Sequence, residues 1–144
     1  MTSIPEYMKS KHRECDDLFT DAESAVASAD WTQASTQWQA FKDELATHFA
    51  QEEGTLFPEV EQATGMTGGP TQVMRTEHQQ MHALFQDLDQ ALNDQQKDSF
   101  LGLSETLIVM MQQHNMKEEM MLYPMLAQNL PQGEAIIASF QTNA

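Results

Sequence analysis

The chain has 144 residues, which favours one domain, and its 22 acidic and 7 basic side chains leave a net charge of −15. Nucleic acids and anionic membranes bind basic surfaces, so this balance argues against both kinds of partner. A single cysteine, Cys15, allows neither an internal disulfide nor a thiolate zinc site. The first 11 residues contain no signal-peptide core, and no stretch of about 18 apolar residues could span a bilayer. We therefore expect a cytoplasmic protein, with a monomer favoured over a weak oligomer.

The first half of the sequence predicts two helical segments, since apolar residues recur at alternating spacings of three and four. The first segment begins near Pro5, and its apolar stripe consists of Met8, His12, Cys15, Phe19, Ala22 and Val26. The second segment begins at Trp31, and its stripe consists of Trp38, Phe41, Leu45, His48 and Glu52. Gly54 and Pro58 then interrupt the helical pattern.

The second half, which follows a loop at residues 65–70 (GMTGGP), repeats this organisation. The stripe of the third segment consists of Met74, His78, Met81, Phe85, Leu88 and Leu92. A turn at Asn93-Asp94 precedes the fourth segment, whose stripe consists of Phe100, Leu103, Leu107, Met110, His114, Met121 and Met125. Four such segments with short connections predict an all-α, up-down-up-down four-helix bundle. Residues 133–140 are expected to form a short C-terminal capping segment.

Histidines occupy inward positions in all four predicted helices. One histidine on an apolar stripe is more often an ordinary core residue than a ligand. Here every histidine of the chain has an inward position, which favours a metal site. The five residues are His12, His48, His78, His82 and His114.

The histidines also reveal an internal repeat with an offset of 66 residues. The segment HRECDDLF from His12 matches HQQMHALF from His78, and HFAQEEGTLFP from His48 matches HNMKEEMMLYP from His114. The sequence therefore predicts a single domain over residues 1–144, made of two related helical hairpins at about 5–64 and 71–128.

Each repeated histidine has an acidic residue or another histidine four positions later. A step of four residues turns by about 40° and rises about 6 Å along an α-helix, so both side chains face the same way. Glu52 and Glu118 are therefore predicted to point inward. A step of five turns by about 140°, so Glu53 and Glu119 are predicted to point into solvent.

These residues together supply five imidazoles and two carboxylates, a set that indicates a dinuclear metal site. One tetrahedral zinc ion would use four ligands, and calcium or magnesium would prefer oxygen throughout. Mixed nitrogen and oxygen donors in this number suit two first-row ions, iron before manganese, with Glu52 and Glu118 as bridges. The Glu-x-x-His pairs of ferritin-like carboxylate sites do not occur at any of the five histidines.

On these spaced ligands, the chain resembles the hemerythrin family, whose bacterial form is the HHE cation-binding domain, over about residues 8–127. The resemblance implies a non-haem di-iron centre with a bridging oxo or hydroxo group. It assigns His78, His82 and His114 to one iron, His12 and His48 to the other, and Glu52 and Glu118 to both. The iron with fewer histidines would keep the open position at which dioxygen binds.

The resemblance implies reversible binding of dioxygen, for storage, delivery or sensing, and favours a gas-binding protein over a catalyst. Glu118 stands four residues after His114, where oxygen carriers usually have an aspartate at five. This spacing resembles the bacterial branch of nitric-oxide-response and iron-centre-repair proteins, so handling of nitric oxide or peroxide, or repair, is the alternative. A metal-stabilised interaction or sensor domain is a third reading. Asp16 stands where the repeat would put a sixth histidine, and it is expected either to orient a ligand imidazole or to act as an extra ligand.

Overall fold

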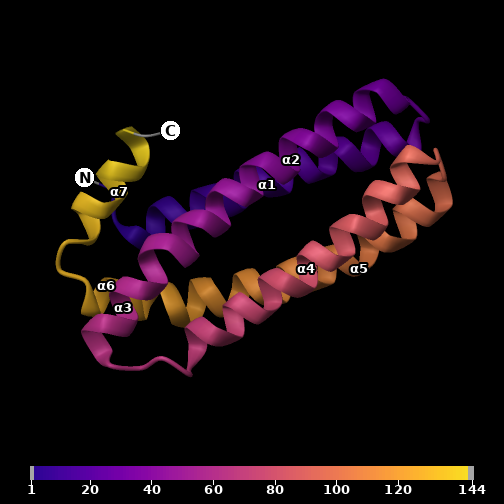
Figure 1. Cartoon of the computed structure of the whole chain (residues 1–144). Coiled ribbons are helices and arrows are strands. Elements are labelled where there is room, and N and C mark those ends of the chain that lie inside the picture. The colour runs from indigo at the N-terminus through magenta and orange to yellow at the C-terminus, as the bar shows by residue number, and fades with distance from the viewer. Residues whose placement is uncertain (1, 143–144) are drawn as a thin grey trace.

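The computed structural model describes residues 2–142, and every regular element in this range is helical. Helix α1 (Ile4–Ala27) packs along α2 (Trp31–Gln51), and α4 (Pro70–Asn93) packs along α5 (Lys97–Lys117). Figure 1 shows the two hairpins lying beside each other, and α1 contacts α5 while α2 contacts α4. The prediction of an all-helical fold is confirmed.

The 66-residue repeat extends into the tight turn that closes each hairpin. In the first turn, Ala29 has a φ of 57° and the N–H of Asp30 donates to the carbonyl of Ala25 over 2.9 Å. In the second, Gln95 has a φ of 54° and the N–H of Gln96 donates to the carbonyl of Ala91 over 2.9 Å. The equivalent turns give both helix pairs the same closing geometry.

Each hairpin also contains a π-helical turn, which begins at Glu52 in the first hairpin and at Glu118 in the second. Helix α2 continues through η1 (Glu52–Leu56) into α3 (Phe57–Thr64), and the N–H of Phe57 donates to the carbonyl of Glu52, five residues earlier. The next residue, Pro58, has no N–H, and its ring would clash with the carbonyl four residues before it in an α-helix. The wider turn accommodates one additional residue at this position.

The second hairpin has the same irregularity. Helix α5 continues through η2 (Glu118–Leu122) into α6 (Tyr123–Asn129), ahead of Pro124. The wider turn explains one error in the predicted stripes, because it carries Met121 to the surface, where it is 67% exposed.

Two apolar clusters fill the interior and leave a polar level between them. The cluster on the side of the hairpin turns contains large aromatic side chains from all four long helices: Phe19, Trp38, Phe41, Phe85 and Phe100. The other cluster lies toward α3, α6 and the C-terminal helix α7 (Gly133–Thr142). Along α1 the chain leaves one cluster at Met8 and enters the other at Cys15, so His12 lies between them.

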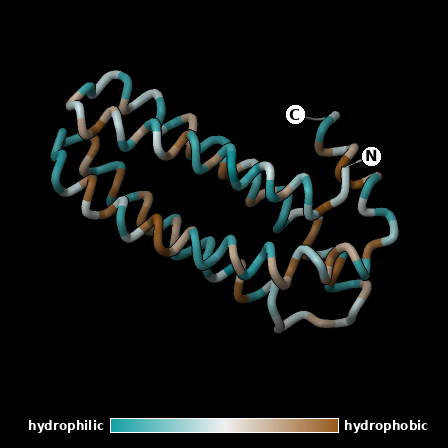
Figure 2. Tube along the Cα trace, turned by 180° about the vertical axis from the view of Figure 1, so that it is seen from behind, coloured by the Kyte–Doolittle hydropathy of each residue, from teal (hydrophilic) through white to brown (hydrophobic). Residues whose placement is uncertain are grey.

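Helix α7 covers the end of the molecule at which α1 begins. Ile137 and Phe140 are buried against the first turn of α1, and the ring centroids of Phe140 and Tyr7 are 6.0 Å apart. Figure 2 shows hydrophobic positions spread along each helix between hydrophilic ones. No helix among residues 2–142 is long and apolar enough to cross a membrane.

Candidate metal centre

Two groups of donor atoms meet at the polar level between the apolar clusters. In each group, one ligand atom per residue lies within 4.8 Å of all the others. The larger group consists of Glu52, His78, His114 and Glu118. The smaller group consists of His12, His48 and Glu118. All six side chains are at most 4% exposed, so the structure brings together six of the seven residues predicted as ligands.

Glu118 faces imidazoles of both groups at a spacing that suits a bridging ligand. Two donors bound at right angles, each about 2.1 Å from an ion, lie about 3.0 Å apart. Oε1 of Glu118 lies 3.1 Å from Nε2 of His12 and 3.2 Å from Nε2 of His114. The first imidazole belongs to the smaller group and the second to the larger.

Glu52 occupies the equivalent place in the other hairpin. Its Oε1 lies 3.2 Å from Nε2 of His78 and 3.6 Å from Nε2 of His48. These imidazoles again belong to different groups. Each carboxylate therefore lies near an imidazole of both groups, although only Glu118 belongs to both.

Several polar atoms of the cluster lack a hydrogen-bonding partner in the described part of the chain, which is consistent with a cation site. Four buried ligand atoms have no hydrogen-bonding partner among the described residues: Glu52 Oε1, His78 Nε2, His114 Nε2 and Glu118 Oε2. A buried polar atom without a partner is unfavourable by about 1–3 kcal/mol, and more when it is charged. Metal ions coordinated by nitrogen and oxygen would satisfy all four atoms.

The two central carboxyl groups have pKa values displaced in opposite directions. Burial raises the pKa of Glu52 well above its ordinary value, and the charge of Glu118 raises it further. Burial would also raise the pKa of Glu118, but its close contacts with Glu52 and with the imidazoles of His114 and His12 outweigh this effect and hold that pKa well below its ordinary value. The two pKa values move apart because two adjacent buried negative charges are unfavourable.

The imidazoles of His48 and His78 are held in the neutral form that binds metals. Burial lowers the pKa of His48 to about 3, and burial also lowers the pKa of His78. His114 differs: burial would lower its pKa, but the carboxylates of Glu118 and Glu77 outweigh burial and raise it.

A second set of carboxylates binds the far nitrogen of three of the imidazoles. Nδ1 of His12 lies 2.7 Å from Glu119, and Nδ1 of His78 lies 2.8 Å from Glu53. Nδ1 of His114 lies 2.8 Å from Oε1 of Glu77, which also pairs with Lys117. A carboxylate at Nδ1 fixes the proton there and leaves Nε2 to face the centre.

The prediction that Glu53 and Glu119 are solvated is confirmed only in part. Their side chains are 41% and 32% exposed, but each also binds an imidazole from another helix, which was not predicted. The prediction assumed a regular α-helix, whereas both glutamates lie in π-helical turns, which change the direction of the following side chains.

Tyr123 is a buried polar residue of the cluster that the sequence analysis did not single out. Its hydroxyl donates to Oε2 of Glu52 over 2.8 Å, and it lies 3.0 Å from Oε1 of Glu118. The only sequence signal was that the repeat pairs this tyrosine with Phe57, so one copy has gained a hydroxyl.

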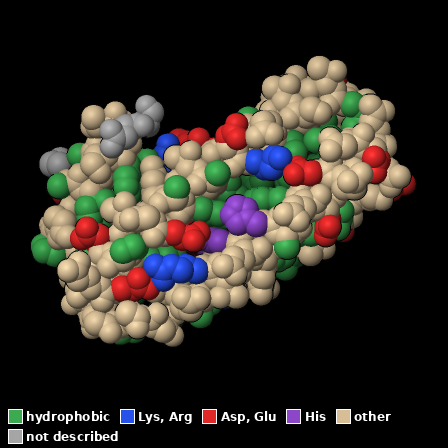
Figure 3. Space-filling view, viewed as in Figure 1, with side chains coloured by type: hydrophobic (Ala, Val, Ile, Leu, Met, Phe, Trp, Pro, Cys, Tyr) green, Lys and Arg blue, Asp and Glu red, His purple; other side chains and the backbone are tan. Residues whose placement is uncertain are grey.

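The expectation that all five histidines face the interior is wrong for His82, whose side chain is exposed. Its ring stands edge-on to Phe49, with centroids 5.6 Å apart. Phe49 itself stacks on His78 at 3.7 Å and fills the interior at this level. Figure 3 shows histidine reaching the surface among hydrophobic side chains in the hollow between the hairpins. The role of His82 as a ligand stays a prediction.

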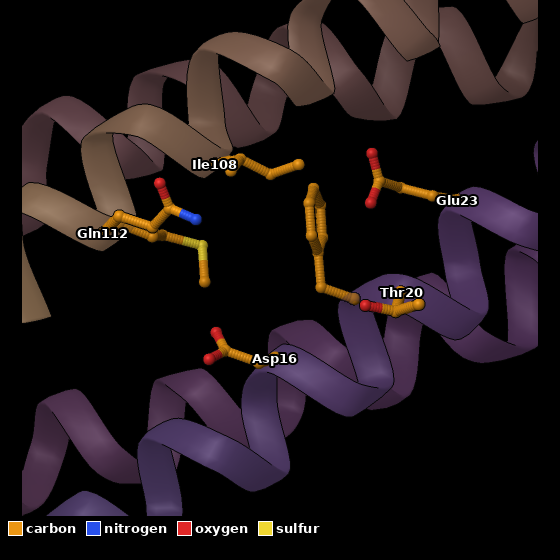
Figure 4. Close-up of a pocket in the computed structure, with 7 residues that line it drawn as sticks. Asp16, Thr20, Glu23, Ile108 and Gln112 are labelled. Atoms are coloured by element: carbon orange, nitrogen blue, oxygen red, sulfur yellow. The ribbon is translucent and has the colours of Figure 1, made fainter.

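Asp16 lies outside both donor groups, at the edge of a cavity of about 220 Å³ between α1 and α5. Figure 4 shows its carboxylate on one side of the cavity, with Gln112 and Ile108 on the opposite helix. The residue is exposed, and Glu119, not Asp16, binds Nδ1 of His12, which lies one turn before Asp16 on α1.

The comparisons with known proteins agree with this geometry. Residues 3–126 match a family model described as the hemerythrin HHE cation binding domain. No curated protein and no solved structure matches the chain. The family match spans most of the 144 residues and includes every residue of the buried cluster, which fits a cation site. The chain belongs to the hemerythrin HHE cation-binding domain family.

Proposed function

We propose that this protein is a non-haem di-iron protein that binds dioxygen reversibly. The observation that carries the proposal is that two buried groups of nitrogen and oxygen donors share Glu118. The proposed unit is one domain over residues 1–144, an up-down-up-down four-helix bundle with related hairpins at about 5–64 and 71–128. We propose iron before manganese, because neutral imidazoles with few carboxylates favour a ferrous site.

The residues of the chain have distinct proposed roles at this centre. Glu52 and Glu118 bridge the two ions, which share an oxo or hydroxo group. One ion is bound by His78, His82 and His114, and the other by His12 and His48. Two ferrous ions would supply the electrons needed to hold dioxygen.

The surroundings of the centre favour reversible binding of dioxygen over its reduction. The aromatic ring of Phe49 covers His78, and apolar clusters lie on both sides of the polar level, so bulk water is excluded. Glu119 and Glu53 hold the imidazoles of His12 and His78 in one orientation.

Metal analysis and an oxygen titration test this proposal. Freshly purified protein is expected to contain two iron ions per chain. The ferrous protein should develop a visible absorption band in air that disappears when oxygen is removed. Irreversible oxidation on the first exposure to air would contradict reversible binding.

Handling of peroxide or nitric oxide is a second candidate, favoured by the hydroxyl of Tyr123. This hydroxyl is a buried proton donor within 3.4 Å of four ligand residues, and reduction of either molecule consumes protons. Stopped-flow measurements of peroxide and nitric oxide consumption test this candidate. Rates no faster than those of free ferrous iron would exclude it.

A further inference from the structure

Tyr123 occupies a special position at the start of α6, directly after the second π-helical turn. The residue is 0% exposed, and its ring lies against His12 with centroids 5.6 Å apart. Its hydroxyl extends out of the apolar cluster into the polar level, on the side of His12 and His48.

The phenol oxygen lies at a nearly constant distance from four ligand atoms. The distances are 2.8 Å to Glu52 Oε2, 3.0 Å to Glu118 Oε1, 3.1 Å to His12 Nε2 and 3.4 Å to His48 Nε2. An octahedral donor lies about 3.0 Å from each of its four neighbours when bonds are about 2.1 Å long. We propose that the phenol oxygen of Tyr123 is a ligand of the ion bound by His12 and His48.

Hydrogen bonding alone does not account for this arrangement. A phenol has one hydrogen to donate, and here Glu52 receives it. Nε2 of His12 then faces a lone pair of the phenol oxygen at 3.1 Å, because Glu119 holds the proton of this imidazole on Nδ1. A cation bound by this nitrogen and by the phenol oxygen would remove the repulsion.

The internal repeat gives the tyrosine a counterpart in the other hairpin. In the 66-residue alignment, Tyr123 replaces Phe57, and Asp16 replaces His82. The ring of Phe57 lies 6.2 Å from that of His78 and offers no oxygen. One ion would therefore have His82 as its additional ligand, and the other would have Tyr123.

This ligand assignment rests on the two-ion part of the proposed function, which both candidates share. A phenolate bound to iron has no proton to give, so the assignment removes Tyr123 as the proton donor of the second candidate. With Tyr123, and with Glu52 and Glu118 as bridges, the ion at His12 and His48 would have five protein donors. Room would remain for an exogenous ligand or a bridging oxygen.

Spectroscopy of the iron(III)-loaded protein tests the assignment. Wild-type protein should show a visible phenolate-to-iron(III) charge-transfer band, and resonance Raman excitation within it should enhance tyrosine ring vibrations. These vibrations should shift when the protein contains ring-deuterated tyrosine, a measurement that needs no variant. Tyr123→Phe, which installs the residue of the other hairpin, should lose the band and bind one ion at least about tenfold more weakly.

Tyr7→Phe is the matched control, because Tyr7 is the other tyrosine of the chain, is 5% exposed, and its hydroxyl accepts from Gln51, which is not a proposed ligand. It should retain the band. If the protein binds two irons per chain but shows no enhanced tyrosine vibrations, the assignment of Tyr123 as a ligand is wrong, while the proposed di-iron site is unaffected. Protein that takes up no second ion would overturn both proposals.

Discussion

Nδ1 of His12 lies 2.7 Å from Oε2 of Glu119, 107 residues later in the chain. The contact joins α1 to the π-helical turn η2. Because this contact occupies Nδ1, the other nitrogen of the ring faces Glu118 at 3.1 Å. An equivalent contact joins His78 to Glu53 over 2.8 Å. The second glutamate of each HxxxEE motif thus orients a histidine of the opposite hairpin.

Replacing this orienting carboxylate should weaken metal binding. Glu119→Gln keeps an oxygen acceptor but loses the charge that makes the imidazole a stronger ligand, so affinity for iron should fall about 10- to 100-fold. Competition with a chelator measures the change. Glu105→Gln, at an exposed position on α5, is the control and should leave affinity unchanged. Wild-type affinity in Glu119→Gln would show that the contact does not act on the metal.

The exposed position of His82 makes its predicted role directly testable. If its side chain rotates to bind iron, His82→Ala should retain only one tightly bound ion, whereas Gln86→Ala, at an exposed position one turn further along α4, should retain two. Iron content after dialysis against a weak chelator distinguishes them. If His82→Ala retains two ions, then His82 is not a ligand, and the larger group binds its ion through Glu52, His78, His114 and Glu118 alone.

Removing metal should destabilise the fold, because ions that bind only the folded state stabilise it. At a free iron concentration about 100 times the dissociation constant, the expected gain is about 2.7 kcal/mol. Urea unfolding with and without iron measures it. A Glu52→Gln/Glu118→Gln double variant lacks both buried carboxylate ligands, so it should bind iron weakly and iron should add little to its stability. Equal unfolding midpoints for loaded and metal-free wild type would contradict metal-coupled stability.

Cys15 should be unreactive in the folded protein. Burial, together with the charges of Glu44 and Asp16, raises the pKa of its thiol from 9.0 to about 12. At about pH 8 only roughly one thiol in ten thousand is ionised, so a disulfide reagent should react rapidly only after unfolding in urea. Fast reaction of the native protein would show that the thiol is accessible.

The same pKa shift predicts a pH-dependent contribution to stability. The unfolded thiol ionises near pH 9.0 and the folded thiol near pH 12, so the contribution is complete below pH 9.0 and is lost as the pH rises toward 12. The difference in unfolding free energy between wild type and Cys15→Ala should therefore narrow between about pH 9 and 11. A constant difference over this range would contradict the shift.

Much of the centre could be predicted from local spacing. A histidine and a glutamate four residues apart face the same way on any regular helix, so the pairs His48–Glu52 and His114–Glu118 were recognisable without a structure. Both pairs are buried, and one ligand atom of each glutamate lies within 3.6 Å of its own histidine. The register failed at Met121 because helix geometry changes at the π-helical turn.

The sequence by itself determined the helices, the repeat and the residue types of a metal site, because these follow from periodicity along one chain segment. Only the tertiary structure decided that Glu53 and Glu119 turn toward imidazoles, that His82 faces outward, and that the hydroxyl of Tyr123 lies among the ligands. These features depend on two π-helical turns and on contacts between residues up to 111 positions apart. A helical pattern with 3.6 residues per turn describes neither, because it contains no information about where a neighbouring helix places its side chains.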